Sequence, residues 1–195
     1  MKIVGLTGSI AMGKSEVVKH LRHRGLAVFD ADQTVHDLYS DGTAARALRT
    51  SFPQAVQGKK IDRAILSHLL QEDPARLKAL EALIHPLVHE RRAAFLAEAR
   101  EQGSVLAVLD IPLLFETHAE GDVDVVVLIT APEALQRQRA LARPGMTPEK
   151  LALILARQMP DAEKRKRAHF VIDNSGDLAH LAAATDAVLA ALTRS

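Results

Sequence analysis

The sequence predicts an α/β protein, a three-layer sandwich in which helices cover both faces of a mostly parallel five-stranded sheet. Five short apolar runs, rich in β-branched residues, recur along the 195 residues, and helical patterns separate them. This alternation is typical of βαβ units, whose strands run parallel and are buried on both faces. The first run also leads directly into a glycine-containing loop and then a helix.

The expected strands are all short and apolar. The second ends in Asp30, and Asp110 directly follows the third. The strands cover residues 2–7, 26–30, 105–109, 123–129 and 170–172, and the last expected helix, which is rich in alanine, covers 178–192. A further helical pattern, from Glu16 to Arg24, follows the first strand, with apolar side chains at helical spacing.

Residues from about 33 to 102 contain no strand-like run, and helices are expected at 61–70 and 74–100. Seventy helical residues exceed what one crossover between strands needs. We therefore expect a helical insertion at the carboxyl edge of the sheet, where open α/β sheets bind ligands. The insertion would supply the site for a second substrate; the alternative is a helical cap that only adds stability.

Composition describes an ordinary globular chain, with 48% hydrophobic and 25% charged residues. The net charge of +1 argues against a general nucleic-acid or membrane-surface binder. Cysteine is absent, which excludes disulfides and thiolate metal sites and fits a cytoplasmic protein. No apolar run approaches membrane-spanning length, and the first residues resemble a strand rather than a signal peptide. Nothing in the sequence indicates the oligomeric state.

Residues 8–15, Gly-Ser-Ile-Ala-Met-Gly-Lys-Ser, fit the phosphate-binding P-loop pattern G-x-x-x-x-G-K-[ST]. Gly8 and Gly13 let the backbone approach an anion closely, and the loop amides point at phosphate from the positive end of a helix. Lys14 can reach the β- and γ-phosphates, and the Ser15 hydroxyl can ligate Mg²⁺. A glycine turn before an ordinary helix is the alternative. The pattern predicts a nucleoside triphosphate site.

Three aspartates follow predicted strands at the edge that carries this loop. Asp30 and Asp32 follow the second strand, and a carboxylate there can accept a proton from an acceptor hydroxyl or help to hold Mg²⁺. A helix N-cap is an equally favoured role for each. Asp110 ends the third strand as a Walker B aspartate does, a weak match alone because strands often end in aspartate.

Arginines follow the fourth strand at helical spacing. Arg139 and Arg143 stand four apart and share one helix face, while Arg137 precedes them. Arginines on a mobile helical lid would neutralise charge on a transferred phosphoryl group; a solvated helix face is the alternative. A second basic run, at 164–167, is interpreted as mostly solvated surface.

Two further stretches carry candidates. The apolar turn 111–116, which includes Leu113, Phe115 and Glu116, is expected to pack on neighbouring structure or, less favourably, to line a pocket. His85 and His89 lack acidic or histidine partners at ligand spacing, so a structural or substrate-contact role is favoured over a metal-binding one.

In this order, the motifs resemble the dephospho-CoA kinase family over nearly the whole chain. Every motif after the P-loop is weak alone, but their joint order is specific. The resemblance rests on residues 6–10, 29–32, 36, 62–63, 84–88, 110–116, 139, 143, 158–160 and 171–176.

The resemblance implies a P-loop kinase-type fold that transfers a phosphoryl group from MgATP to the ribose 3′-hydroxyl of dephospho-CoA. It implies one domain with a core (1–32, 103–136 and 157–195), a helical CoA-substrate insertion (about 33–102) and a lid (about 137–156). Asp32 is the implied general base, acting with Lys14 and Arg139. Residues implied around ATP are Gly8, Ala11, Met12, Gly13, Lys14, Ser15, Glu16, Arg143 and Asn174, the last near the adenine. Residues implied around dephospho-CoA are Asp32, His36, Arg63, His85, Leu113, Phe115 and Glu116.

Several positions depart from the family pattern. Glu16 stands where threonine is usual, and Ala11 and Met12 replace a frequent Gly-Ser pair. His89 and His169 stand where arginine and aspartate are common. None of these departures removes Lys14, Ser15 or Asp32.

Two rival functions follow from the same motifs. A nucleoside or nucleotide kinase would share the loop, insertion and lid, and would differ only in its acceptor. A GTP-driven switch would explain Asp173 to Gly176, which match D-x-x-G, but no Asn-Lys-x-Asp follows to read guanine.

Overall fold

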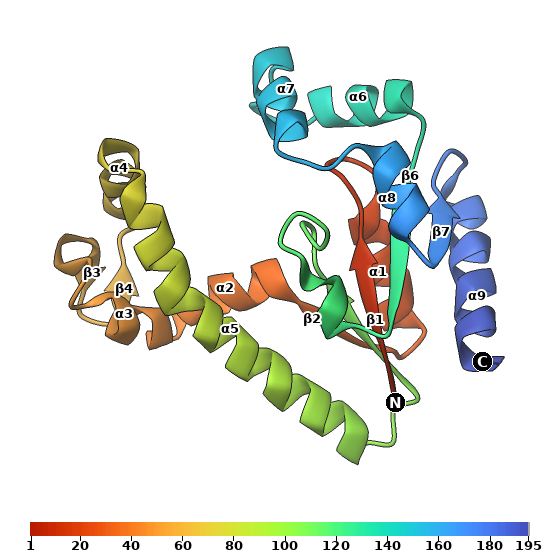
Figure 1. The fold of residues 1–195 in the computed structure, drawn as a ribbon, viewed down its shortest axis with the longest axis horizontal. Helices are drawn as coiled ribbons and strands as arrows, with labels where there is room; N and C mark the ends of the chain where they lie inside the picture. The colour runs from red at the N-terminus through yellow and green to blue at the C-terminus, as the bar shows by residue number, and fades with distance from the viewer. Residues whose placement is uncertain (195) are drawn as a thin grey trace. The chain divides into compact units, whose positions relative to one another are not determined.

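The structure, a computed structural model, describes residues 1–194 and divides the chain into two compact units. The first unit comprises residues 1–29 and the chain from residue 99 onward; the second comprises residues 30–98. Figure 1 shows the elements of both units in chain order by colour.

The first unit is built on a five-stranded sheet. Its strands are β1 (Lys2–Thr7), β2 (Ala27–Asp30), β5 (Leu106–Asp110), β6 (Val125–Thr130) and β7 (Phe170–Asp173), in the order β2-β5-β1-β6-β7. The last residue of β2, Asp30, is counted with the second unit. The pairs β1–β5, β1–β6 and β6–β7 are parallel, with Leu6 opposite both Asp110 and Val127. The predicted mostly parallel five-stranded sheet is therefore confirmed, with strand ends that differ from the prediction by one or two residues.

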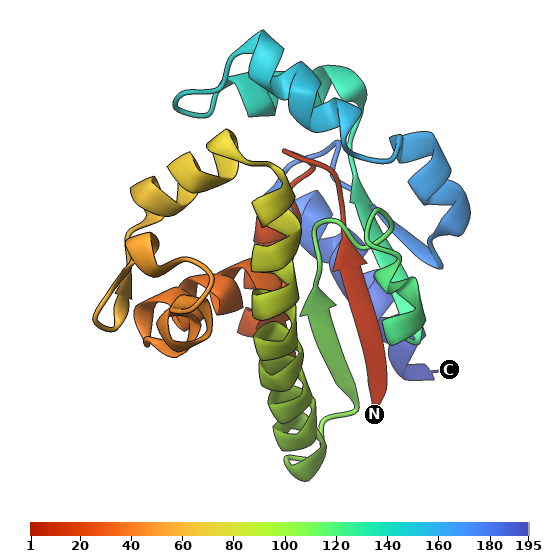
Figure 2. The same ribbon diagram turned by 60° about the vertical axis from the view of Figure 1, so that its left-hand side comes forward.

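Helices and a long turn cover the two faces of this sheet. The helices of the unit are α1 (Lys14–His23), α6 (Glu133–Leu141), α7 (Pro148–Ala156), α8 (Asp161–Arg167) and α9 (Leu178–Arg194), with a 3₁₀ turn η2 (Ala119–Asp122). On one face Val17, Leu21 and Leu181 of α1 and α9 join the strand side chains in one core. On the other face Leu114 and Phe115, from the turn after β5, pack on β6. Figure 2 shows the strands ending below α6 and α7.

The second unit has its own apolar core. Its elements are α2 (Ala31–Ser40), α3 (Thr43–Leu48), η1 (Pro53–Ala55), β3 (Val56–Gln57), β4 (Lys60–Ile61), α4 (Arg63–Glu72) and α5 (Ala75–Glu101), whose last residues belong to the first unit. Leu38, Leu48, Phe52, Leu66 and Ile84 form the centre of the core. The helix expected at 74–100 forms as α5 and continues through Pro86.

The expectation that residues 33–102 contain no strand was wrong. β3 and β4 pair as a small antiparallel hairpin with Val56 opposite Ile61. Each strand has only two residues, which is too short for an alternating pattern to be visible in sequence. The partly buried side chains of Val56 and Ile61 pack against the core of the second unit, and this packing explains the hairpin.

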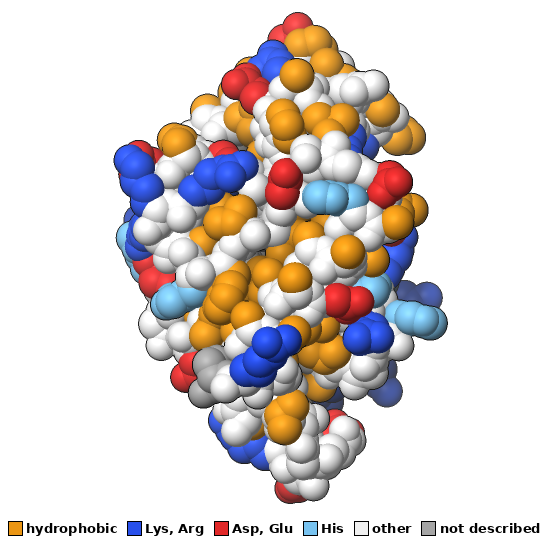
Figure 3. All heavy atoms as spheres, turned by 90° about the vertical axis from the view of Figure 1, so that its right-hand side faces the viewer, with side chains coloured by type: hydrophobic (Ala, Val, Ile, Leu, Met, Phe, Trp, Pro, Cys, Tyr) orange, Lys and Arg blue, Asp and Glu red, His pale blue; other side chains and the backbone are white. Residues whose placement is uncertain are grey.

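The start of β1 and the last turn of α9 meet at the amino edge of the sheet. The Lys2 ammonium donates a hydrogen bond of 3.0 Å to the Leu192 carbonyl, which ties the start of β1 to the end of α9. On the side of the molecule that carries α9 and β7, hydrophobic side chains are mingled with charged ones (Figure 3). Leu178, at the start of α9, is exposed.

Candidate active site

The P-loop connects β1 to α1, as its sequence predicts. Gly13 has a φ of 95°, and a methyl group there would collide with the Asn174 side chain. Gly8 lies against β6, where an added Cβ would stand 2.7 Å from the Ile129 carbonyl oxygen. Both positions therefore require glycine. Gly13 requires it for its backbone angle and for space, and Gly8 for its close approach to β6.

Lys14, the first residue of α1, forms an ion pair with Asp110 at the end of β5. Their side chains are only 16% and 7% exposed. The pair forms because β1 and β5 are adjacent and parallel, so that the loop after one strand meets the carboxyl end of the other. The two residues that the sequence singled out separately are thus brought into contact.

The next two residues of α1 lie on the surface of the first turn. Ser15 is exposed. Glu16 accepts a hydrogen bond of 2.7 Å from Lys19, one turn further along the same helix. Glu16 is thus held by a local ion pair on the helix surface, where it still lines the pocket described next.

An open pocket of about 600 Å³ adjoins the P-loop. It is lined by Ala11, Gly13, Ser15, Glu16, Arg139, Arg143, Asn174, Gly176, Asp177, Leu178 and Leu181. The structure therefore brings both predicted lid arginines, the predicted Asn174 and the loop to one cavity. Arg137 instead lies 3.7 Å from Glu133, its neighbour on α6.

Asn174 connects three parts of this pocket. Its amide Nδ2 donates to the Met12 carbonyl at 2.8 Å, and its backbone N–H donates to Thr130 of β6. Its backbone carbonyl accepts a hydrogen bond of 3.1 Å from the Arg139 guanidinium. The residue is 5% exposed. Through these three hydrogen bonds, the buried Asn174 connects the P-loop, β6 and α6.

The candidates of the second unit lie on three of its helices. Asp30 is the N-cap of α2, and its carboxylate accepts from the Gln33 N–H at 2.9 Å. Asp32 is exposed in the first turn of the same helix. His36, one turn later, is also exposed. The capping role that the sequence left open between the two aspartates thus belongs to Asp30. His85 is exposed on α5.

Arg63, the first residue of α4, stacks on an aromatic ring that sequence reasoning did not single out. Its guanidinium carbon lies 5.5 Å from the centre of the Tyr39 ring. Burial raises the pKa of Tyr39, and the Arg63 charge opposes that shift. Asp62 caps α4 just before Arg63, accepting two backbone hydrogen bonds of 3.0 Å.

The turn after β5 is held by charged groups. Leu113 is exposed, whereas Phe115 is 1% exposed and Glu116 accepts a hydrogen bond of 2.8 Å from the Met159 N–H. The Lys164 ammonium lies 2.8 Å from Glu116 and is fully buried. Burial alone would raise the pKa of Glu116, but the hydrogen bonds from Lys164 and Met159 and the Lys164 charge hold that pKa below its ordinary value.

The interpretation of residues 164–167 as mostly solvated surface was wrong for Lys164. α8 packs beside β6, so one side chain of its short sequence must point inward, and Glu116 supplies the opposite charge. Arg167 is also partly shielded from solvent. Its guanidinium lies 4.9 Å from the centre of the Phe115 ring and pairs with Glu120. This basic run therefore stabilises the turn that follows Asp110.

His169, Gln136 and Gln158 were given no role by sequence reasoning. His169 Nδ1 accepts a hydrogen bond of 3.0 Å from the Val126 N–H, so this departure from the family pattern has a structural role beside β6. Gln136 and Gln158 both hydrogen-bond to Ile10 of the P-loop. The only sequence signal was that Gln158 stands in one of the family motifs.

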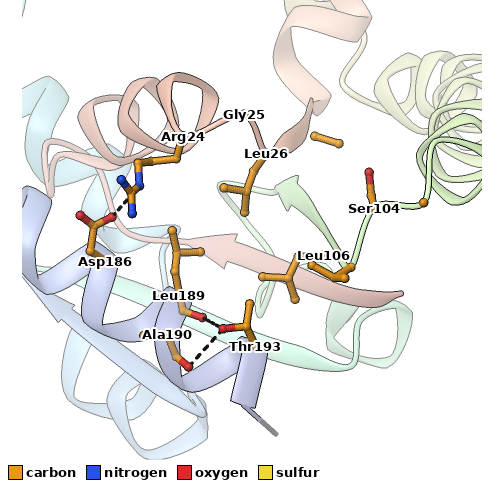
Figure 4. Close-up of a pocket in the computed structure, with 12 residues that line it drawn as sticks. Arg24, Gly25, Leu26, Ser104, Leu106, Asp186, Leu189, Ala190 and Thr193 are labelled. Carbon is orange, nitrogen blue, oxygen red and sulfur yellow. Dashed lines mark hydrogen bonds and ion pairs between the residues drawn. The ribbon is translucent and has the colours of Figure 1, made fainter.

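A second pocket, of about 550 Å³, lies at the opposite, amino edge of the sheet. Figure 4 shows Leu26, Leu106 and Leu189 lining it, with the Arg24–Asp186 ion pair on its wall. None of the predicted site residues lines it. Of these two pockets, only the one beside the P-loop is lined by residues that the sequence predicts for the nucleotide.

Residues 1–194 lack two features. No cluster of three or more His, Cys, Asp or Glu side chains there is arranged to hold a metal ion. In the same part of the chain, no helix combines the length and apolar character needed to cross a bilayer.

The sheet carries a P-loop after β1 and an aspartate at the end of β5, with Arg139 on α6 and Arg143 just after it. This arrangement is that of a P-loop kinase. The family model described as dephospho-CoA kinase matches residues 2–180. The chain belongs to the dephospho-CoA kinase family.

Relatives share most of their length with this chain. A dephospho-CoA kinase of Mesorhizobium japonicum is 52% identical over 189 residues, covering 97% of this chain and 95% of the relative. One from Rhodopseudomonas palustris is 51% identical over 178 residues, covering 91% and 89%. Among solved structures, TT1252 from Thermus thermophilus is 40% identical with a TM-score of 0.81, covering 98% of this chain and 97% of that one. A shikimate kinase from Bacteroides thetaiotaomicron, at 14% identity and a TM-score of 0.54, shares the fold.

Proposed function

We propose that this chain transfers the γ-phosphoryl group of ATP to the ribose 3′-hydroxyl of dephospho-CoA, giving coenzyme A and ADP, the last step of coenzyme A biosynthesis. The observation that carries this proposal is the family match over residues 2–180, combined with a P-loop that keeps its two essential side chains, Lys14 and Ser15. The chain spans most of the length of its relatives, so the activity of the whole family is the natural expectation.

The donor side of the reaction falls to the first unit. The P-loop amides at the start of α1 suit the β- and γ-phosphates, and the Lys14 ammonium would exchange its contact with Asp110 for one with phosphate. Arg139 and Arg143, which line the pocket beside the loop, would neutralise charge on the phosphoryl group during transfer.

Mg²⁺ is the metal that the donor chemistry of this site suits. The Ser15 hydroxyl and the Asp110 carboxylate are hard oxygen ligands, and Asp110 already lies against the P-loop lysine. When bound, Mg²⁺ would neutralise charge on the β- and γ-phosphates.

Asp32 is the proposed general base for the acceptor hydroxyl. Asp30 is the N-cap of α2. The Asp32 carboxylate is exposed in the first turn and does not cap the helix. A carboxylate so placed can accept a hydroxyl proton as the phosphorus–oxygen bond forms. The assignment of His36, Arg63, His85, Leu113, Phe115 and Glu116 to the acceptor stays a prediction, as does a cytoplasmic location.

The test is an acceptor assay on purified protein with MgATP. Dephospho-CoA, a panel of nucleoside monophosphates and no acceptor are compared, and products are identified by mass. We expect ADP and coenzyme A only with dephospho-CoA, and no turnover with the Lys14→Ala variant. ADP formation that depends on a nucleoside monophosphate instead would overturn the proposal.

A further inference from the structure

The lid segment α6–α7 is attached to the P-loop at both of its ends. Gln136 lies near the start of α6, and Gln158 follows the end of α7. Although 22 positions separate them in the sequence, both side chains reach Ile10, the third residue of the P-loop.

The two glutamines bind both polar backbone groups of Ile10, its N–H and its carbonyl. Gln136 Nε2 donates to the Ile10 carbonyl at 2.9 Å, and the Ile10 N–H donates to Gln158 Oε1 at 3.1 Å. Gln136 is 5% exposed, so its amide has little access to water as a substitute partner. The two glutamines and the Ile10 backbone are called the glutamine clamp below.

Apolar packing reinforces the glutamine clamp. Ala11 has a φ of 61°, an uncommon angle for a residue with a side chain, and its methyl group is buried against Ala140 and Leu151 of α6 and α7. Ile10, Met146 and Leu155 pack against these three residues. Ala11 occupies one of the two positions where the chain departs from the usual Gly-Ser pair, so the departure supplies a surface on which the lid packs.

We propose that Gln136 and Gln158 are positioning residues that hold the arginine-bearing segment to the P-loop, so that Arg139 and Arg143 stay directed at the bound phosphates. The inference rests on the proposed function in taking the P-loop as the ATP site. Neither glutamine lines the pocket. Each acts through Ile10, by fixing the loop peptide on one side and the lid on the other.

The two hydrogen bonds run in opposite directions, and this provides a discriminating test. Glutamate at position 158 keeps an oxygen acceptor for the Ile10 N–H. Glutamate at position 136 loses the donor and sets a carboxylate against a carbonyl oxygen. Methionine at either position keeps the length of the side chain and removes both kinds of hydrogen bond.

The experiment measures kcat and the KM for ATP for five variants: Gln136→Glu, Gln136→Met, Gln158→Glu, Gln158→Met and, as the matched control, Gln138→Glu. Gln138 is exposed on α6, so its variant adds the same charge to the same helix away from the clamp. We expect about a tenfold loss of kcat for Gln136→Glu, Gln136→Met and Gln158→Met, and at most about a threefold loss for Gln158→Glu and the control. A fully active Gln136→Glu, or equal losses for the two position-158 variants, would overturn the clamp.

A coupling measurement separates positioning from simple packing. In an Arg143→Ala background, Gln158→Met should cost much less than in the natural protein, because the arginine that it positions is gone. Fully additive losses would contradict the proposal. If the Gln136 variants do not fold, the comparison at the partly exposed position 158 decides alone.

ADP affinity, measured by calorimetry on the same proteins, keeps the two proposals distinguishable. A natural protein that binds ADP but does not phosphorylate dephospho-CoA would remove the proposed function. The clamp would still be tested by the position-158 variants. We expect Gln158→Glu to bind ADP several-fold more tightly than Gln158→Met, and equal affinities would contradict the clamp.

Discussion

The Lys14 ammonium and the Asp110 carboxylate form an ion pair that joins the P-loop to the end of β5. Both side chains are largely shielded from water, and Asp110 as a whole is 5% exposed. An ion pair in such surroundings is costly to break from one side, because the remaining charge stays buried. The phosphates of a bound nucleotide would compete with Asp110 for the same ammonium group.

The first prediction concerns this pair. Lys14→Ala should nearly abolish turnover and lower the free energy of unfolding by about 3 kcal/mol, because it removes the Lys14 charge from beside the buried Asp110 carboxylate. Lys14→Ala/Asp110→Asn should recover much of that stability without recovering turnover. Urea unfolding at neutral pH measures both effects. A single variant as stable as the natural protein would show that Asp110 does not depend on Lys14.

The second prediction separates space from backbone angle in the P-loop. Gly13→Ala should destabilise the protein by about 3 kcal/mol or more, because a methyl group would enter the Asn174 side chain at a φ of 95°. Gly25 has a φ of 79° but nothing near its missing Cβ, so Gly25→Ala should cost only about 1 kcal/mol. Thermal or urea unfolding compares them. Equal losses would mean that the Asn174 contact yields without cost.

The third prediction distinguishes two neighbouring aspartates. Asp32→Asn should slow transfer by roughly 10²-fold or more and leave ADP affinity unchanged, because it removes the base and not the donor site. Asp30→Ala should instead lower stability by about 1 kcal/mol, because it removes the N-cap of α2. Turnover, calorimetry and unfolding are measured on both variants. Near-normal rates for Asp32→Asn would remove that residue from the base role.

The fourth prediction is a pH dependence of stability. The folded-state pKa of Glu116 lies below its ordinary value of 4.5, so the stability that Glu116 contributes is complete above that value and is lost as the pH falls through the folded pKa. Between neutral pH and about pH 3.5, the natural protein should therefore lose more unfolding free energy than Glu116→Gln. Parallel pH profiles for the two proteins would disprove it.

The fifth prediction tests the partner of Glu116. Lys164→Met should cost about 3–5 kcal/mol, because it leaves the Glu116 carboxylate partly buried without its cation. Lys164→Met/Glu116→Leu should recover most of that loss. Lys166, which is 70% exposed on the same helix, offers a matched control: Lys166→Met should change stability little. Unfolding free energies of all three variants decide the matter.

The parts of the fold that local sequence determines were predictable. The P-loop, the five strands and the helix through Pro86 each follow from residue pattern over a short window. The burial of Lys164 was not predictable, because a four-residue basic run looks solvated until Glu116 and α8 are placed together. The division of roles between Asp30 and Asp32 likewise depends on where α2 begins, which sequence locates only to within a residue or two.

The candidate site shows the same limit. Sequence placed Lys14, Ser15 and Asp110 on the correct elements, because each follows a recognisable strand. It could not reveal that Gln136 and Gln158 meet at Ile10, since a glutamine carries no pattern that names its partner. Contacts between residues more than a hundred positions apart depend on the packed structure, and no local motif encodes them.

The contacts of Asn174 have a consequence for the growing chain. During synthesis the P-loop emerges first, but Asn174, which supports the Met12 carbonyl, is made 162 positions later. The ribosome adds about 5–20 residues per second, so the loop exists for many seconds before Asn174 is made. A nascent or truncated chain that ends before residue 174 therefore carries the full P-loop sequence without the amide that fixes its shape.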